Sequence, residues 1–304
     1  MAYFWEIGGL SWKQLSRRVW REARQDILFN RAAAMAFYFL FSLFPLLLFL
    51  TALLGLFARG GTQLRNDMLS YLSRVAPVSA SALIYETVDE IGKGSDGGKL
   101  SFGFLLALWT ASSGIVAIIE ALNAAYDVKE SRPWWKERLV AMGLTLAIAF
   151  LVVTALLLVL YGGDIAEALA SRHGFGDAFT VAWKILQWPI ILAFVLSAFI
   201  LIYYFGPNVD HQKLRWVMPG AVVSLTVWLL VSFAFRLYLR YFNTFSATYG
   251  SLGAVIILMS WFYLSSLAIL IGGEINTEIE HAAAEAGAPE AKKPGEKSPG
   301  DLAS

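Results

Sequence analysis

The sequence contains no cysteine among its 304 residues. A chain without cysteine forms no disulfide framework and offers no thiolate to a metal or redox site. Charged residues make up only 15% of the chain, and its formal net charge is +1. A chain so close to neutral is not suited to bulk binding of nucleic acid. These features exclude disulfide-rich secreted domains and thiolate enzymes, and they argue against a basic nucleic-acid-binding protein.

Histidine is also scarce. His173, His211 and His281 fall in three separate segments, so no zinc triad or catalytic base constellation is visible. We interpret each of them as a solvated loop residue. The sequence contains neither a GxSxG nucleophile elbow nor an HExxH zinc motif. We therefore expect no enzyme activity, no catalytic residues, no cofactor and no metal.

The sequence is rich in long apolar stretches, and 58% of its residues are hydrophobic. Each of six stretches reaches the ~20 residues that a helix needs to cross a hydrocarbon core ~30 Å thick. The chain also has 11 Trp and 12 Tyr residues that can anchor helix ends at the two interfaces. We predict an all-α polytopic membrane protein with six transmembrane helices and amphipathic surface helices. The predicted spans are 33–58, 101–125, 139–161, 181–205, 217–241 and 250–273.

Lys and Arg residues concentrate on alternate connections between these spans. Most of them lie in the N-terminal segment, in the second and fourth connections and in the tail. Cytoplasmic connections carry the excess of basic residues in multi-pass proteins. We therefore predict that both termini lie on the cytoplasmic side of a plasma membrane.

The N-terminal segment, residues 1–30, has its own pattern. Leu15, Val19, Ala23 and Ile27 recur every four residues, and basic residues occupy the other faces. This pattern predicts an amphipathic helix that lies on the cytoplasmic membrane surface.

The rest of the chain divides into two further regions. Residues 31–280 form the predicted six-helix transmembrane domain, in which the outer loop 60–99 predicts two short amphipathic helices. Residues 281–304 are rich in Ala, Glu, Pro, Lys and Gly and have no apolar period, which predicts a disordered cytoplasmic tail.

Polar residues gather at the inner ends of the second and sixth spans. Ionisable groups at membrane depth are costly, and they usually mark a transport pathway or a paired structural site. One interpretation is a ring of ion pairs that locks the helix ends together, and the other is the inner mouth of a polar cavity. The residues that we assign to this inner polar cavity are Glu120, Asn123, Arg132, Glu274 and Asn276.

Two arginines form a second candidate site. Arg236 and Arg240 lie one turn apart near the outer end of the fifth span. Guanidinium groups bind phosphate in a forked geometry, so a lipid headgroup or an anionic amphiphile is one ligand for the pair. Snorkelling of both side chains to the outer interface explains them equally well.

Small residues and prolines indicate how the spans pack. A fourfold ladder of small residues from Ser113 to Ala125 predicts close helix packing, and we expect it to bring Glu120 near Glu274. Proline interrupts three predicted spans, and broken helices need protein or water partners for the freed carbonyls. The prolines are Pro45, Pro189 and Pro219. This pattern favours a bundle with an internal cavity.

Four segments carry a family resemblance. They are AFYFLFSLFPLLLFL (36–50), ASSGIVAIIEALNAAYDVKESRPWWKERL (111–139), YYFGPNV (203–209) and YGSLGAVIILMSWFYLSSLAILIGGEINTEIE (249–280). Over about residues 15–280 the chain resembles the YihY/BrkB family, which implies a protein of the bacterial inner membrane. Members of that family have been labelled ribonuclease BN, linked to serum resistance and virulence, and proposed as transporters of lipids, lipopolysaccharide or cations. No catalytic residue carries over from the resemblance.

Three functions are compatible with these features. The first is a transporter or flippase of a lipid or other amphiphile in the cell envelope. The second is a cation/proton antiporter that uses Glu120 and Glu274 as proton carriers. The third is a non-transporting scaffold for envelope assembly. The partners that we expect are membrane lipids and an amphiphile or ion substrate, without nucleic acid, and a homo-oligomer is left open. We do not expect a ribonuclease, which needs clustered carboxylates or histidines to hold metal or move protons.

Overall fold

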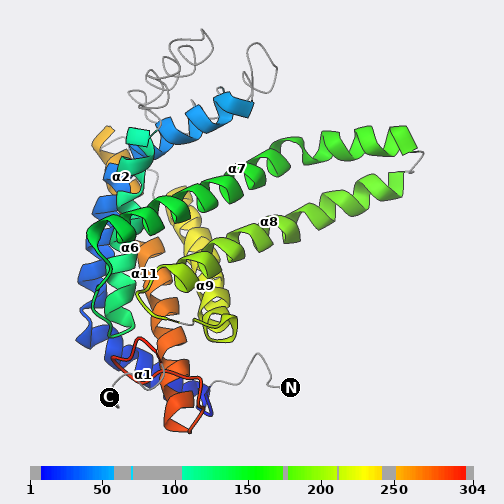
Figure 1. Ribbon diagram of the computed structural model, residues 1–304. Coiled ribbons are helices and arrows are strands. Elements are labelled where there is room, and N and C mark those ends of the chain that lie inside the picture. The colour runs from blue at the N-terminus through cyan, green and yellow to red at the C-terminus, as the bar shows by residue number, and fades with distance from the viewer. Residues whose placement is uncertain are drawn as a thin grey trace. The chain divides into compact units, whose positions relative to one another are not determined.

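A computed structural model describes residues 8–57, 70, 105–173, 177–210, 212–241 and 251–298 of the chain (Figure 1). Every regular element in these residues is a helix, so the predicted all-α class is confirmed. The outer loop 60–99, with its two predicted amphipathic helices, lies outside the described residues apart from Ser70. The helices are α1 (Trp12–Gln25), α2 (Leu28–Phe57), α6 (Ser113–Ala125), α7 (Trp134–His173), α8 (Asp177–Phe205), α9 (Leu214–Tyr241) and α11 (Ser251–Glu285).

Several of these helices are long and apolar enough to cross a membrane. By length and composition, five spans qualify among the described residues, and α1 with Leu28–Leu43 makes a sixth if this pair, bent by 66°, counts as one span. The polytopic architecture is therefore confirmed. The five spans are Leu105–Ala125, Trp134–Gly163, Val181–Phe205, Leu214–Tyr241 and Val255–Glu285.

The chain forms two compact units, and α2, α7 and α8 each pass from one unit into the other. Unit 1 comprises Met1–Leu40, Gly114–Leu144 and Val195–Ser304, and unit 2 comprises Phe41–Ser113 and Thr145–Phe194. All of the candidate site residues named from the sequence belong to unit 1.

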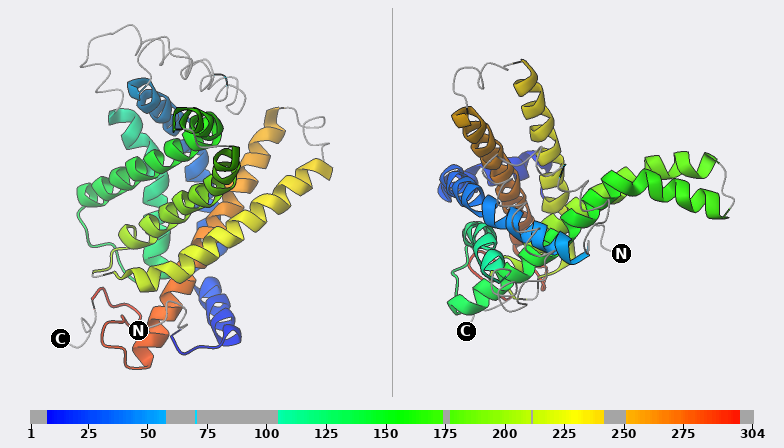
Figure 2. Two further views of the ribbon diagram at one scale, coloured as in Figure 1. Left: turned by 90° about the vertical axis from the view of Figure 1, so that its right-hand side faces the viewer. Right: turned by 90° about the horizontal axis from the view of Figure 1, so that it is seen from above.

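Unit 2 contains a helical hairpin made of the later part of α7 and the earlier part of α8, which lie side by side (Figure 2). The two helices approach closely at Gly162, where an added Cβ would lie 2.6 Å from Oε1 of Gln187. Large apolar side chains such as Val181, Ile185 and Trp188 are exposed on α8. An exposed face of this composition suits contact with hydrocarbon rather than with water.

In unit 1, α9 packs against α11 along a row of residues that recur every four positions on α9: Gly220, Ser224, Trp228 and Ser232. At one end of the row the backbones nearly touch, because an added Cβ at Gly220 would overlap the carbonyl oxygen of Gly272. Small residues are what allow helices to approach this closely in a membrane.

Hydrogen bonds reinforce the same crossing. The hydroxyl of Tyr203 on α8 donates to the carbonyl of Ile269 at 2.6 Å, and the hydroxyl of Ser224 donates to the carbonyl of Ala268 at 2.9 Å. Tyr203 and Ser224 are both fully buried. Buried polar groups in an apolar bundle need such partners.

The prediction that prolines break the spans is wrong. Pro45, Pro189 and Pro219 all lie inside continuous helices. After Pro219, the backbone N–H of Gly220 donates to Oδ1 of Asn276 at 2.7 Å, so a side chain of α11 serves a backbone group of α9. A neighbouring helix can satisfy the backbone around a membrane proline in this way.

Only the C-terminal end of the small-residue ladder of α6 is seen to approach α11. Ala117, Ala121 and Ala125 are buried. An added Cβ at Gly273 of α11 would lie 2.8 Å from Cδ2 of Leu122 and 3.8 Å from the Cβ of Ala125. The small size of Gly273 therefore leaves room for the side chain of Leu122 at this point.

The predicted N-terminal helix is observed as α1. One of its faces packs against α9 and α11, and the other faces are exposed. Its start has a capping box, in which the backbone N–H of Gln14 donates to Oγ of Ser11 at 3.3 Å and the backbone N–H of Ser11 donates to Oε1 of Gln14 at 2.8 Å. Leu15 is buried in a cluster with Trp216 of α9 and Ile279 of α11. Figures 1 and 2 show α1 beside the C-terminal part of α11.

The region after residue 280 differs from the predicted disordered tail. The helix α11 continues to Glu285 and ends in a Schellman motif at Gly287, which has φ +85°. The following segment contacts the rest of unit 1, since the backbone N–H of Asp210 donates to the carbonyl of Lys297 at 2.9 Å and Lys292 is buried. Composition predicted disorder because it does not reveal partners that lie far away in the sequence.

Candidate functional site

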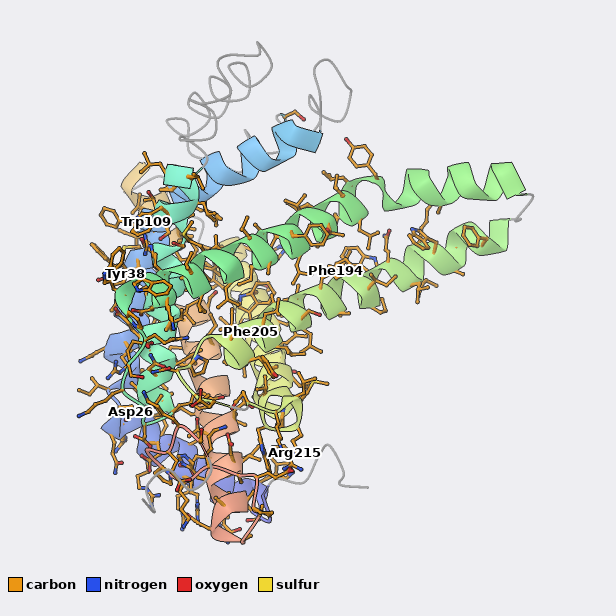
Figure 3. The ribbon with its side chains drawn as sticks, viewed as in Figure 1. Asp26, Tyr38, Trp109, Phe194, Phe205 and Arg215 are labelled. Carbon is orange, nitrogen blue, oxygen red and sulfur yellow. The ribbon has the colours of Figure 1, made fainter. Side chains whose placement is uncertain are left out.

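A polar site begins at the bend between α1 and α2, where Asp26 lies (Figure 3). The next residue, Ile27, has φ +54°, a conformation that costs a β-branched residue about 1–2 kcal/mol. Nε of Arg31 donates to the carbonyl of Asp26 at 2.9 Å and so helps to hold the bend. Asp26 lines a pocket that begins at this bend.

The end of α6 supplies a second carboxyl group. Asp127 has φ +53° and occupies the left-handed position of a Schellman motif. In this motif the backbone N–H of Asp127 donates to the carbonyl of Ala124, and that of Val128 donates to the carbonyl of Asn123, both at 2.9 Å. Aspartate tolerates this conformation better than most residues, and here it directs a carboxyl group to the pocket.

One face of α11 supplies four more titratable side chains to this site. Glu274, Glu278, His281 and Glu285 are spaced by four, three and four positions, which places them on one side of a helix. Glu274 and Glu278 are 1% and 5% exposed, and His281 is 8% exposed.

These elements enclose a pocket of about 500 Å³, which we call the acidic pocket. Its charged lining contains six carboxyl groups and two guanidinium groups, so it favours cations and protons over anions. It is lined by Arg18, Arg21, Glu22, Gln25, Asp26, Ala125, Asp127, Glu274, Thr277, Glu278, His281, Glu285, Pro294 and Gly295.

Ion pairs occupy one side of the acidic pocket. The guanidinium of Arg18 donates to both carboxylate oxygens of Glu285, at 3.2 and 2.8 Å, and lies 3.7 Å from Glu278. Arg21 pairs with Glu22 at 3.2 Å. The Arg18 contacts tie α1 to α11, whereas the Arg21–Glu22 pair lies within α1.

The other side of the acidic pocket has carboxyl groups without a cation. In the described part of the chain, neither Glu274 nor Asp127 forms an ion pair with Lys or Arg. The carboxyl groups of Asp26 and Glu274 lie within hydrogen-bonding reach of each other. Two carboxyl groups can share a hydrogen bond only if one of them carries a proton, so this pair is suited to hold a proton.

Burial raises the pKa of Asp26 above its ordinary value and the negative charge of Glu22 adds to the shift, although the hydrogen bond with Glu274 and the charge of Arg31 act in the opposite direction. Burial likewise raises the pKa of Asp127, with further contributions from the charges of Asp26 and Glu22. Asp26 and Asp127 therefore hold protons more tightly than isolated aspartates do.

Two of the predicted cavity residues form a separate structural cluster. Nη2 of Arg132 lies 2.7 Å from the carboxylate of Glu130 and donates to the carbonyl of Gly206 at 3.0 Å. Nδ2 of Asn123 donates to the same carboxylate at 2.8 Å, and Oδ1 of Asn123 accepts from the backbone N–H of Asn208 at 2.7 Å. These bonds fasten the α6–α7 connection to the α8–α9 connection.

The hydrogen bonds of this cluster also change the pKa of Glu130. Partial burial raises the pKa of Glu130, but hydrogen bonds from Arg132 and Asn123 and the charge of Arg132 outweigh burial, so the pKa lies below its ordinary value. The ionised form of Glu130 is thus favoured by its contacts with Arg132 and Asn123.

The remaining predicted residues occupy different places. Asn276 is buried at the α9–α11 crossing, where it binds Gly220. Glu120 is exposed on α6 and is not among the described residues that line the acidic pocket. The expected approach of Glu120 to Glu274 is therefore not observed, because the buried face of α6 presents Ala121 and Leu122 instead.

Arg236 and Arg240 are exposed near the end of α9. The chain that follows them, residues 242–250, lies outside the described residues. Within the described residues, neither guanidinium forms an ion pair, so both remain candidates for an anionic ligand.

Of the carboxyl and imidazole groups that line the acidic pocket, only Glu274 was assigned to the inner cavity from the sequence, which missed Glu22, Asp26, Asp127, Glu278, His281 and Glu285. The prediction that His281 is a solvated loop residue is wrong, because α11 continues past it. Its helical spacing from Glu274 was the available signal. No group of three or more His, Asp or Glu side chains that could hold a metal occurs among the described residues.

Comparison with known proteins places the chain among membrane proteins. The family profile described as Virulence factor BrkB matches residues 19–296. A Bacillus subtilis protein, YfkH, whose name carries a ribonuclease-like label, is 41% identical over 253 residues, which cover 81% of this chain and 88% of that protein. No solved structure matches the chain.

Other relatives are described only as membrane proteins. One from Idiomarina loihiensis is 31% identical over 198 residues, which cover 62% of this chain and 63% of the relative. Another, from Xanthomonas campestris, is 25% identical over 276 residues, which cover 86% of this chain and 60% of the relative. With its apolar helices and a profile match over most of its length, the chain belongs to the Virulence factor BrkB family of membrane proteins.

Proposed function

We propose that this protein is a proton-coupled membrane transporter of a cation and that the acidic pocket is its binding site. The observation that carries the proposal is the Asp26–Glu274 carboxyl pair, which lies in a pocket of about 500 Å³ and in which Glu274 forms no ion pair with Lys or Arg of the described chain. Ionisable groups at membrane depth commonly serve in proton or ion pathways.

The proposed site opens at the cytoplasmic side of a bacterial inner membrane. The tail segment that lines the acidic pocket also binds the basic connections, since Lys297 contacts Ser131 and Arg215 contacts Glu290. Basic connections mark the cytoplasmic side of multi-pass proteins. This orientation rests on the same distribution of basic residues as the prediction of cytoplasmic termini, and the positions of labelled termini would test both.

In the proposed mechanism, the pair formed by Asp26 and Glu274 binds either a proton or a cation. Entry of a cation beside the two carboxyl groups favours their ionised forms, and the shared proton leaves to the solvent. Return of the proton weakens the attraction for the cation. Because the two forms exclude each other, movement of one species is coupled to movement of the other.

Proteoliposomes that contain the purified protein and an internal pH-sensitive dye would test this mechanism. A gradient of Na⁺ or K⁺ should drive a change of internal pH with the intact protein, and Glu274→Gln should abolish it. Glu120→Gln is the matched control, because it removes one carboxylate from an exposed position outside the acidic pocket. Equal pH changes for the intact protein and Glu274→Gln would refute the proposal.

A flippase for an anionic amphiphile is the second candidate function, and Arg236 and Arg240 support it. Both are exposed, lie one turn apart and lack an ion pair in the described residues. Movement of a fluorescent anionic phospholipid between leaflets of vesicles, reduced in Arg236→Ala/Arg240→Ala, would favour this candidate. Stable protein partners without flux of either kind would instead favour an envelope-assembly scaffold.

We also infer that the chain is not a ribonuclease. The candidate carboxylates of the acidic pocket are partly paired with Arg18 and Arg21 rather than gathered as ligands for a metal. Incubation of the purified protein with structured RNA and Mg²⁺ is expected to leave the RNA intact, and cleavage that Glu274→Gln removes would contradict this inference.

A further inference from the structure

A second hollow lies on the opposite side of α1 from the acidic pocket. It is a groove of about 410 Å³ between α1, the start of α2, α9 and α11. Its walls are apolar and include Val19 and Trp20 of α1, Phe29 of α2, Val223 of α9 and Ile271 of α11. Sites of this size and lining bind the apolar parts of small ligands.

The rim of the groove carries exposed aromatic rings. Trp12 and Trp20 are 65% and 53% exposed, although both also line the groove. Amphipathic helices place such rings at the boundary between headgroups and acyl chains. The groove therefore opens toward a lipid surface rather than toward bulk water.

A strip of positive charge runs along α1 next to the groove. Lys13, Arg17 and Arg24 recur at spacings of four and seven residues, which puts them on one face of the helix. All three are exposed, and Arg24 lies 4.8 Å from the centre of the Trp20 ring at the rim.

The residues of this strip differ from the other arginines of α1 in their ion pairing. Arg18 and Arg21 turn to the acidic pocket and pair with its carboxylates. Within the described chain, Lys13, Arg17 and Arg24 form no ion pair. Their charge is therefore available to an anionic ligand.

We propose that α1 and this groove form a binding site for an anionic phospholipid. An acyl chain lies in the groove against Val19 and Ile271, and the phosphate lies on the strip formed by Lys13, Arg17 and Arg24. The apolar groove and the adjoining positive strip match the two halves of such a lipid, whereas a zwitterionic lipid would gain little from the strip. The site binds lipid whether or not the acidic pocket transports a cation.

The full-length protein in detergent, titrated with phosphatidylglycerol or phosphatidylcholine and observed by native mass spectrometry, would test the site. Phosphatidylglycerol should bind with about tenfold or higher preference, because each cation near the surface strengthens anionic lipid binding. The variant Lys13→Gln/Arg17→Gln/Arg24→Gln should lose this preference. Lys129→Gln/Lys136→Gln/Lys293→Gln, which removes three exposed cations outside α1, is the control and should keep it.

A second variant tests the groove separately from the charge. Ser16 lines the groove and is exposed, so Ser16→Trp should fill the groove without disturbing the packed core. It should weaken binding of phosphatidylglycerol while leaving the thermal melting temperature near that of the intact protein. Equal binding of the two lipids by the intact protein, or full phosphatidylglycerol binding by both α1 variants, would overturn the proposal. So would a protein segment that occupies the groove in a lipid-bound sample.

Discussion

Nζ of Lys292 lies 2.9 Å from the carboxylate of Glu280, and both side chains are almost completely buried. Nζ also donates to Oε1 of Gln212 at 2.8 Å, so the cation joins the tail to α11 and to the α8–α9 connection. A buried ion pair contributes little relative to apolar residues, but loss of one partner leaves an unpaired buried charge.

Lys292→Met should therefore lower the free energy of unfolding by about 3 kcal/mol or more. Lys292→Met/Glu280→Gln should recover much of this loss, because no unpaired charge remains. Thermal unfolding in detergent measures both effects, and Lys293→Met is the control at an exposed neighbouring position. Equal melting temperatures for Lys292→Met and Lys293→Met would contradict the observed burial.

Replacement of Asp127 by Asn should stabilise the protein at neutral pH. The folded-state pKa of Asp127 is raised, chiefly by burial, so its ionised form is disfavoured by folding. Asn also suits the positive φ at this position. The advantage of Asp127→Asn should shrink as pH falls through the folded pKa toward the unfolded value of ~3.9, because the native carboxyl group then becomes protonated. Unfolding experiments between about pH 4 and 8 would show whether the advantage depends on pH in this direction.

The Arg132–Glu130 contact should have the opposite pH dependence. The folded-state pKa of Glu130 is lowered, so its contribution to stability is present above the unfolded pKa of ~4.3 and is lost as pH falls through the folded pKa. Arg132→Gln should destabilise the protein at neutral pH and remove most of this acid-dependent loss. Lys129→Gln, which changes a neighbouring exposed cation, should retain it. Parallel acid profiles for the intact protein and Arg132→Gln would argue against the contact.

Gly220→Ala should weaken the crossing of α9 and α11. The added methyl group would overlap the carbonyl of Gly272 and Oδ1 of Asn276, and overpacking of this kind costs about 1–3 kcal/mol. Gly143→Ala is the matched control, because an added Cβ there meets nothing within 4 Å. The control should be neutral or up to about 1 kcal/mol more stable, since alanine is the better helix former. Unfolding of the two variants in the same detergent compares the positions directly.

Some parts of the candidate site were visible in the sequence because they follow from helical spacing. Glu274, which we assigned to the inner cavity, lines the acidic pocket, and Glu278 lies one turn further along the same helix face. Asn123 and Arg132 were assigned to the same cavity, but they join two connections instead of lining the acidic pocket. Spacing shows which residues share a face, but not what that face meets.

Other parts depend on contacts between distant segments. Asp26 reaches Glu274 only because the chain bends after α1 at a residue with positive φ, a conformation that the sequence around Ile27 does not indicate. Lys292 looked like part of a solvated tail because its partner Glu280 is recognisable only in the folded chain.

The sequence alone determined the all-α membrane class, the approximate spans and the family resemblance. It could do so because the thickness of hydrocarbon requires about 20 consecutive apolar residues for each crossing, which is a local property. Tertiary structure decided that Asp26 joins Glu274, that Glu120 stays exposed and that the tail packs on α11. Those outcomes depend on helix crossings and on one bend, where the close approach of Gly220 to Gly272 and the conformation of Ile27 set which polar groups meet.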